Sequence, residues 1–158
     1  MEPFVNVGGT GDACPAPTDQ QAPDDAALAA LLERTRTVAV VGLSPKPERT
    51  SHQVAAWLQD NTPFDLYWVN PMAAGQQVLG QPVYASLAEL PLVPDLVDVF
   101  RRSEDVPPVV EAAIAVGAKA VFMQLGIVNK EAAAIASAAG LDVVQNRCLK
   151  VEYRRLMG

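Results

Sequence analysis

The residues best placed to do chemistry lie in one short segment that directly follows an apolar run. Residues 37–41 (TVAVV) are uncharged and mostly apolar, and the run ends at Gly42. A loop carrying Lys46 and Arg49 comes next, followed by two hydroxyl residues. This order predicts a buried strand, a turn and a new helix, whose first backbone N–H groups lack intrahelical partners and favour negative charge. The segment therefore predicts a binding site for a phosphorylated ligand.

The hydroxyl residues at the start of that helix, Thr50 and Ser51, are expected to cap it. Ser44, in the loop before them, either contacts the ligand or bonds the turn backbone, as short hydroxyl residues often do. His52 falls in the first helical turn. We expect it to be a helix-start residue rather than a catalytic base, because we can assign no second group that would position it.

A second pair of cations follows another apolar run. Arg101 and Arg102 come directly after residues 96–100 (LVDVF). Ligands of parallel α/β sheets bind beyond the carboxyl ends of the strands, where the strand order reverses. In the usual strand order this crevice lies between strands 37–41 and 96–100. We therefore expect the two cationic loops to face each other.

The glycine loop does not match the fingerprint of a dinucleotide-binding site. The G-x-G-x-x-G pattern requires glycines where this chain has Ser44 and Pro47. NAD binding also favours an acidic residue after the second strand, and Asn70 and Pro71 stand there instead. No G-x-x-x-x-G-K-[ST] segment occurs, which argues against a P-loop nucleotide hydrolase.

Length and composition fit one domain with a core of its own. A chain of 158 residues, 50% of them hydrophobic, is expected to bury roughly 70% of its unfolded surface. No uncharged run approaches the ~20 residues needed to cross a bilayer, and the first residues lack a signal-peptide pattern. The two cysteines, Cys14 and Cys148, form no C-x-x-C motif, which argues against zinc and thioredoxin-type sites. We expect a reduced, cytoplasmic protein with no membrane partner.

The charge of the chain narrows the class of partner. A formal net charge of −6 argues against a nucleic-acid partner, because phosphate backbones require a basic face. It does not argue against a small phosphorylated ligand. Charges more than about 8 Å apart are largely screened at physiological salt, so a few local arginines outweigh the global sign.

Alternating apolar runs and helical patterns must position the two loops. Residues 1–23, rich in Gly and Pro, are expected to form an extended arm, and residues 24–158 the folded domain. The alternation predicts an α/β, Rossmann-like, doubly wound parallel sheet with helices on both faces. The expected strands are 37–41, 66–69, 83–84, 96–100, 119–125 and 141–144. The expected helices start at Asp24 or Asp25 and cover 51–60, 87–90 (one turn), 106–116 and 129–139, with a short helix at the end.

Five motifs follow one another along the chain: GLSPKPERTS (42–51), VNP (69–71), VDVFRRSE (97–104), MQLG (123–126) and NRCLKVEY (146–153). Together they closely resemble the family of small stand-alone CoA-binding domains. The resemblance runs from about residue 37 to residue 153. The first half of the chain is more distantly similar to the CoA-binding domain of the succinyl-CoA synthetase alpha subunit and of ADP-forming acyl-CoA synthetases.

The resemblance implies a role for each loop. Residues 44–47 would wrap the CoA phosphates, residues 70–71 would border the nucleotide end, and residues 100–102 would flank the adenine and the phosphates. Residues 123–125 would approach the pantetheine arm. Guanidinium groups suit the pyrophosphate and 3′-phosphate of CoA, which they bind by charge-assisted hydrogen bonds. The implied CoA-binding residues are Gly42, Leu43, Ser44, Lys46, Pro47, Arg49, Thr50, Ser51, Asn70, Pro71, Phe100, Arg101, Arg102 and Gln124.

Two further side chains have two interpretations each. Asp98 interrupts an apolar strand beside the crevice. It is either a structural carboxylate bonded to loop N–H groups or an arginine, or a carboxyl with a raised pKa and a catalytic role. Cys148, close to Arg147 and Lys150, either forms a mixed disulfide with the CoA thiol or is a buried inert thiol.

The sequence therefore predicts a domain that binds CoA or an acyl-CoA, without chemistry of its own. Two alternatives stay open: a small NAD(P)-dependent redox enzyme or sensor, and the CoA-binding subunit of an acyl-CoA synthetase whose catalytic half is a separate polypeptide. The alanine-rich helix 129–139 either packs against a second subunit, as in a homodimer, or lies on the sheet.

Overall fold

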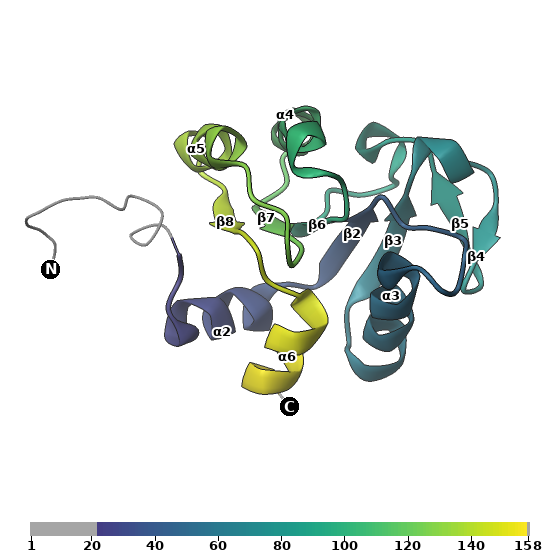
Figure 1. Cartoon of the computed structure of the whole chain (residues 1–158), viewed down its shortest axis with the longest axis horizontal. Helices are drawn as coiled ribbons and strands as arrows, with labels where there is room; N and C mark the ends of the chain where they lie inside the picture. The colour runs from purple at the N-terminus through teal and green to yellow at the C-terminus, as the bar shows by residue number, and fades with distance from the viewer. Residues whose placement is uncertain (1–21, 158) are drawn as a thin grey trace, which may run out of the picture.

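The computed structural model describes residues 22–157, so the expected arm over residues 1–23 lies, apart from its last two residues, outside the described residues. The described part is a seven-stranded sheet between two layers of helices (Figure 1). The strands are β2 (Thr37–Val41), β3 (Asp65–Val69), β4 (Gln77–Val78), β5 (Gln81–Tyr84), β6 (Leu96–Val99), β7 (Ala120–Met123) and β8 (Asp142–Val144). The helices are α2 (Asp25–Arg34), α3 (Thr50–Asn61), α4 (Val106–Val116), α5 (Lys130–Ala138) and α6 (Leu149–Met157). The short 3₁₀ turns are η1 (Pro71–Ala73), η2 (Leu87–Glu89) and η3 (Ser103–Asp105).

The strand order reverses at β2. The sheet runs β4-β5-β3-β2-β6-β7-β8, and every pair is parallel except β4 with β5. Val41, the last residue of β2, lies opposite Val69 of β3 and Val99 of β6, so the three carboxyl ends are level. The prediction of a doubly wound, Rossmann-like sheet is confirmed, and the carboxyl ends of β2 and β6 lie side by side at the reversal of strand order.

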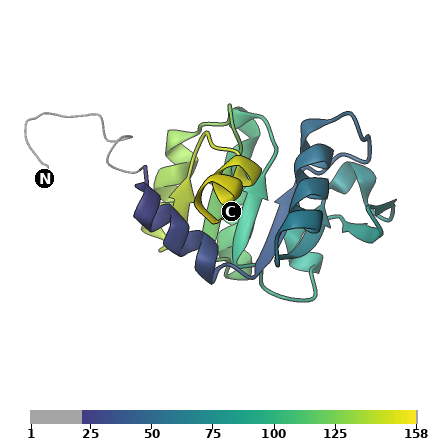
Figure 2. The same ribbon diagram turned by 90° about the horizontal axis from the view of Figure 1, so that it is seen from below.

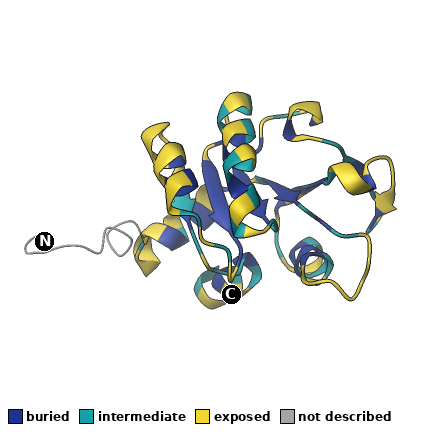
Figure 3. Cartoon of the chain, turned by 45° about the horizontal axis from the view of Figure 1, so that its top comes forward, coloured by how far each residue is buried: buried dark blue, intermediate teal, exposed yellow. Residues whose placement is uncertain are grey.

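Helices cover both faces of the sheet. Helices α4 and α5 lie on one face, and α2, α3 and α6 lie on the other (Figures 1 and 2). Alternating side chains of β2 serve both layers: Val38 and Val40 join the core under α2, α3 and α6, whereas Ala39 and Val41 join the core under α4 and α5. The central strands β6 and β7 are buried from end to end, and β2 is buried from its second residue onward, while the helices keep an exposed outer face (Figure 3).

Local sequence signals set most helix ends. The carboxylate of Asp24 accepts a hydrogen bond from Ala27 N at 2.8 Å, and the amide of Asn129 accepts one from Ala132 N at 2.9 Å. These are N-caps that satisfy otherwise unpaired donors. Helix α4 ends at Gly117, which adopts a left-handed conformation with φ +86°. No helix in the described part of the chain is long and apolar enough to cross a bilayer.

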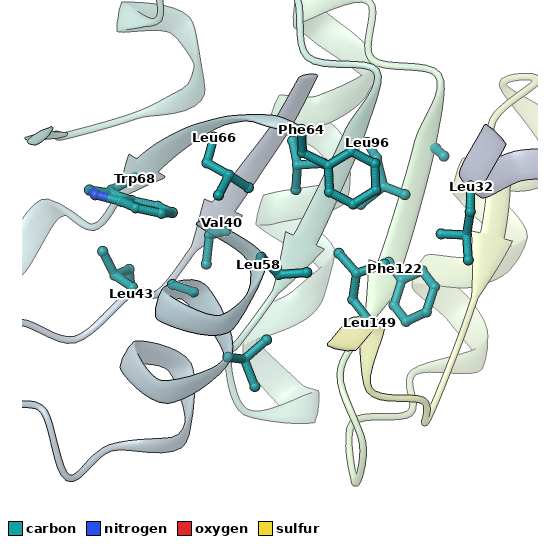
Figure 4. Packing of buried hydrophobic residues seen from close by; sticks show 14 of the residues in the cluster. Leu32, Val40, Leu43, Leu58, Phe64, Leu66, Trp68, Leu96, Phe122 and Leu149 are labelled. Carbon is teal, nitrogen blue, oxygen red and sulfur yellow. The ribbon is translucent and has the colours of Figure 1, made fainter. Parts of the chain in front are cut away.

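The sequence predicted residues 83–84 of β5 as a strand, but it predicted neither β4 nor the β4–β5 hairpin. A strand of two residues carries too little periodicity to be read. The structure secures it through Trp68, whose indole N–H donates to Val78 O at 2.8 Å while the ring is fully buried. Trp68 packs in the core that also holds Leu58, Leu66 and Phe122 (Figure 4).

Candidate functional site

The loops after β2 and β6 touch at Gly42. Its backbone N–H donates to Val69 O at 2.8 Å, and Phe100 N donates to Val41 O at 2.8 Å. Gly42 has φ +92°, and a Cβ built on it would overlap the Phe100 carbonyl oxygen and lie 3.2 Å from Arg101 Cδ. Glycine is required here twice, for its backbone conformation and for this close approach. The two loops therefore converge, as the sequence predicted.

Hydrogen bonds within the loop hold it against the start of α3. Ser44 N donates to Ser51 Oγ at 2.9 Å, and Lys46 N donates to Ser44 Oγ at 3.1 Å. The ring of His52 donates from Nδ1 to Ser44 O at 3.0 Å, since a carbonyl can only accept. Ser44 thus bonds the turn backbone, which was one of its two interpretations.

The prediction that Thr50 and Ser51 cap α3 is wrong. The N-cap is Arg49, which makes no side-chain capping bond, and Thr50 and Ser51 are already helical. The Ser51 hydroxyl reaches backwards to the loop instead of its own helix. Within the described residues, no hydrogen bond to the N–H groups of Thr50, Ser51 and His52 is found, so these donors are available to an anion.

Three cations around this helix start are free of acidic partners within residues 22–157. Lys46 and Arg49 are exposed, and Arg101 is half-buried beside Gly42. Arg102 differs: its guanidinium is paired with Asp105 at 3.0 Å and Glu104 at 3.7 Å, and it is largely exposed. These carboxylates raise the pKa of Arg102 further above its ordinary value, first through the hydrogen bond that Arg102 Nε donates to Asp105.

Asn70 fixes the loop from the neighbouring strand. Its amide nitrogen donates to Leu43 O at 2.8 Å, and its amide oxygen accepts from Met72 N at 3.0 Å. Both polar atoms of the side chain are therefore used by the protein. Asn70 positions the glycine loop and starts the η1 turn, whereas the adjacent Pro71 is exposed at the same edge.

An apolar pocket of about 370 Å³ opens on the α4 side of the two loops. Its position, at the carboxyl ends of β2 and β3, places it beside Gly42 and under Arg101. A pocket of this kind offers a flat, apolar ring a place next to an anion site. It is lined by Val41, Val69, Pro71, Ala85, Ser86, Leu87, Arg101, Asp105, Pro108, Val109 and Ala112. Of these lining residues, only Pro71 and Arg101 were predicted from the sequence as binding residues. The other lining residues lie on elements that only the fold brings together.

On the opposite face of the sheet, Asp98, Phe100 and Gln124 lie close together at the ends of β6 and β7. Asp98 lies beside Phe122, and Gln124 N donates to Val99 O at 3.2 Å, which places Gln124 next to Phe100. Phe100 is half-buried, whereas Gln124 is 5% exposed. The Gln124 amide oxygen and both Asp98 carboxylate oxygens are buried without a hydrogen-bond partner among the described residues.

Asp98 is not the bonded structural carboxylate of the first interpretation. It is fully buried, and none of the expected loop N–H groups or arginines reaches it. The reason is its register: it lies opposite Val40 and Phe122 within the sheet, two residues before Phe100, where the loop begins. Burial without compensating hydrogen bonds raises the pKa of Asp98 well above its ordinary value, so the neutral form is favoured.

The structure also places Leu43 and Cys148, two further residues of the sequence analysis. The side chain of Leu43 is fully buried in the core (Figure 4), so only its backbone faces the crevice. Cys148 is a free, half-buried thiol directly before α6, in the wall of a separate cavity. Within the part of the chain that the structure describes, no group of acidic, histidine or cysteine side chains could hold a metal ion.

Comparison with known proteins identifies relatives over most of the chain. The uncharacterized protein YneT of Bacillus subtilis is 38% identical over 133 residues, which are 84% of this chain and 96% of that protein. A solved structure of a hypothetical protein from Pyrococcus horikoshii superposes with a TM-score of 0.82 at 38% identity, covering 87% of this chain and 95% of that one. A structure from Thermus thermophilus gives a TM-score of 0.80 at 33% identity, covering 85% and 99%.

A more distant neighbour shares the fold alone. The dinucleotide-forming acetyl-coenzyme A synthetase 1 of Ca. Korarchaeum cryptofilum is 21% identical with a TM-score of 0.59, over 68% of this chain and 25% of that enzyme. The family model described as a CoA binding domain matches residues 36–154, which include both converging loops, the apolar pocket and the start of α6. The chain therefore belongs to the CoA binding domain family.

Proposed function

We propose that this protein binds coenzyme A or an acyl-CoA at the carboxyl edge of its sheet, without catalysis of its own. The observation that carries the proposal is the contact between Gly42 and the Phe100–Arg101 loop. The contact brings together the Arg101 guanidinium and the first N–H groups of α3, which have no partner among residues 22–157, and an apolar pocket opens beside Arg101. CoA has a matching set of parts: an adenine, a pyrophosphate and a ribose 3′-phosphate.

The pocket on the α4 side would take the adenine. Its wall is mostly aliphatic, and Ser86, Arg101 and Asp105 are its polar side chains. Arginine stacks on aromatic rings and binds phosphate at the same time, because its guanidinium is planar and keeps its charge. The pyrophosphate would then lie over Gly42 and the first turn of α3, where the helix dipole favours negative charge. Lys46 and Arg49, exposed on the same loop, would reach the 3′-phosphate.

The pantetheine arm would leave the crevice on the other side, past Phe100 and Gln124. This direction leads from β6 towards β7, away from the adenine pocket. Arg102 would contribute less than Arg101, because Asp105 and Glu104 already neutralise it. Leu43 and Asn70 would act indirectly: one anchors the loop in the core, and the other holds its backbone.

Calorimetric titration with CoA tests the proposal directly. Replacing Arg101 by Ala should weaken CoA binding by about 1.5–3 kcal/mol, the range for hydrogen bonds to charged groups, which is roughly 10- to 150-fold. Arg36→Ala is the matched control. Arg36 is exposed and directly precedes β2, so it lies at the amino ends of the strands, opposite the proposed site. Unchanged affinity in Arg101→Ala would place the site elsewhere.

Two other ligands separate the proposal from its alternatives. Dephospho-CoA should bind more weakly than CoA, and Lys46→Ala with Arg49→Ala should remove that difference. NAD⁺ should bind more weakly than CoA, because the acidic residue that recognises its ribose is replaced by Asn70, whose amide is already engaged. Tighter binding of NAD⁺ than of CoA would overturn the assignment.

A further inference from the structure

A second cavity lies between the loop after β7 and the start of α6. It has a volume of about 310 Å³, and its wall includes Leu125, Cys148 and Val151. Leu125 is 66% exposed and Val151 is 41% exposed, so two large apolar side chains of this wall are open to solvent. We call it the α6 cavity. Its volume is at the lower limit for small-molecule pockets, which suits one part of a ligand rather than a whole cofactor.

Hydrogen bonds fix both walls of the α6 cavity. Arg147 N donates to Met123 O at 3.2 Å, and Gly126 N donates to the amide oxygen of Asn146 at 2.7 Å. Asn146 has φ +59°, a conformation that asparagine adopts more readily than most residues. The loop that carries Leu125 is therefore tied to the segment directly before α6.

The charged side chains around the α6 cavity neutralise one another. Arg147 and Glu152 both lie in its wall and are 3.3 Å apart, and Glu152 is also 2.6 Å from Arg155. Arg155 in turn pairs with Asp25 at 2.8 Å. Two guanidinium groups thus meet two carboxylates. An uncharged occupant suits such a cavity better than an anion, because an anion would compete with these carboxylates for their partners.

Gln124 stands between the crevice and the α6 cavity. In the chain it directly precedes Leu125 of the cavity wall, and in the sheet it lies next to Phe100 of the crevice. Its amide oxygen is buried and accepts no hydrogen bond from the described part of the chain. Buried acceptors normally have a donor, and the amide N–H groups of a pantetheine arm are donors of this kind.

The start of α6 shares a face of the sheet with Gln124. Phe122 comes two residues before Gln124, so both side chains are on the same face of β7. Phe122 and Leu149, the first residue of α6, belong to one core cluster, and Figure 4 shows them next to each other. Cys148 directly precedes Leu149 and lies in the cavity wall. A ligand that passes Gln124 on this face therefore reaches the α6 cavity.

The width of the sheet matches the length of the pantetheine arm. From the end of β2, where the pyrophosphate is proposed to lie, the path crosses β6 and β7 to the segment after β8, which holds Arg147. Neighbouring strands are about 4.8 Å apart, so these three steps measure about 14 Å. The arm has a backbone of about twelve bonds, as many as four residues, and extends to roughly 13–14 Å. Its sulfur would then lie at the α6 cavity.

We propose that the α6 cavity binds the acyl group of an acyl-CoA, and that this group is an uncharged aliphatic chain. The inference rests on the proposed CoA site, because that site decides where the arm ends. It names the class of ligand. Aliphatic acyl-CoA thioesters bind more tightly than free CoA, whereas an acyl group that ends in a carboxylate adds no affinity.

Calorimetric titration of the full-length chain with four ligands tests this inference. Hexanoyl-CoA should bind at least about tenfold more tightly than CoA, the gain expected from burying about two methylene groups. Succinyl-CoA should bind no more tightly than CoA. Adenosine 3′,5′-bisphosphate, which lacks the arm, should still bind. Equal affinities for hexanoyl-CoA and CoA would overturn the inference and leave the proposed function standing, whereas no binding of any of the four ligands would refute the proposed function as well.

A pair of valine variants tests the cavity itself. Val151→Trp fills the α6 cavity and should abolish the preference for hexanoyl-CoA over CoA. Val93→Trp is the matched control, because Val93 is 53% exposed and lies before β6, at the amino ends of the strands. It should keep the preference. A tenfold preference that survives Val151→Trp would place the acyl group elsewhere.

Cys148 reports directly on the occupancy of the α6 cavity. In a Cys14→Ser variant, Cys148 is the only thiol of the chain. Saturating hexanoyl-CoA should slow its alkylation by iodoacetamide at least about tenfold, because the acyl chain covers the cavity wall. Adenosine 3′,5′-bisphosphate should leave the rate unchanged. The same alkylation rate with and without hexanoyl-CoA would contradict an acyl group in this cavity.

Discussion

Replacing Gly42 by alanine tests the geometry on which the whole site depends. Two costs are expected. The first is conformational, because Gly42 has φ +92°, and a residue with a Cβ pays about 1–2 kcal/mol in the left-handed region. The second is steric, because the new Cβ would overlap the Phe100 carbonyl oxygen and lie 3.0 Å from its carbon. Relieving such overpacking typically costs a further ~1–3 kcal/mol.

Gly140 provides a control that isolates the second cost. It has φ +91°, nearly the same as Gly42, but nothing lies within 4 Å of an added Cβ. It follows α5, at the opposite end of the sheet from the crevice. Gly140→Ala should therefore lower the free energy of unfolding by about 1–2 kcal/mol, and Gly42→Ala by about 2–5 kcal/mol. For a domain of this size, the difference between the two variants corresponds to a melting temperature of Gly42→Ala about 2–12 °C below that of Gly140→Ala.

The same substitution should also affect ligand binding. To relieve the overlap, the loop after β2 must move away from Phe100, and this movement displaces the backbone groups proposed to face the phosphates. CoA affinity should fall by at least about tenfold in Gly42→Ala, which equals about 1.4 kcal/mol, and stay unchanged in Gly140→Ala. Denaturant unfolding and calorimetric titration measure the two effects. Equal losses of stability in both variants, with CoA affinity intact, would refute the close approach of the two loops.

Three further predictions follow from single side chains. Asp98→Asn should gain stability relative to the parent as the pH rises above about 4. The raised pKa keeps the native carboxyl protonated while the carboxyl of the unfolded chain ionises near 3.8, so only the parent loses stability. A stability difference independent of pH, in denaturant titrations at several pH values, would contradict the unpaired burial of this group. Asn70→Ala removes the hydrogen bond to Leu43 O, so it should lower the free energy of unfolding by about 1–2 kcal/mol and weaken CoA binding. Thermal shift with and without CoA measures both effects. An unaltered response to CoA would exclude a positioning role for Asn70. Trp68→Phe leaves Val78 O unpaired and should lower the free energy of unfolding, measured in urea, by about 1–3 kcal/mol. A smaller loss of stability would mean that water reaches Val78 O in the β4–β5 hairpin.

The types of most helices and strands could be predicted from the sequence, because the local residue pattern and the burial in the fold agree. The apolar run 37–41 is a strand in a parallel sheet, as predicted, since a strand buried on both faces has no polar side to alternate. Helix α4 begins at Val106 and ends at Val116 as predicted, because prolines fit a first turn and Gly117 takes the left-handed conformation. The resemblance to CoA-binding domains is confirmed over residues 36–154.

The errors came from side chains whose partners lie across the fold. Thr50 and Ser51 were expected to cap α3, because a hydroxyl before a helix usually does so. The loop turns back on itself, and Ser51 is used by Ser44 N instead. Asp98 was expected to find a partner in a loop, but its register within β6 keeps it between Val40 and Phe122. No local signal distinguishes these outcomes.

The sequence by itself determined the order of strands and helices, the convergence of two cationic loops at the strand ends and the family. These properties follow from periodicity, from glycine and proline positions and from short motifs, all of which act over a few residues. Only the tertiary structure decided which cations stay free, which polar groups are buried without partners, and where an apolar pocket opens beside Arg101. These depend on distances between residues far apart in the chain, and such distances exist only once the sheet has brought its strands into register.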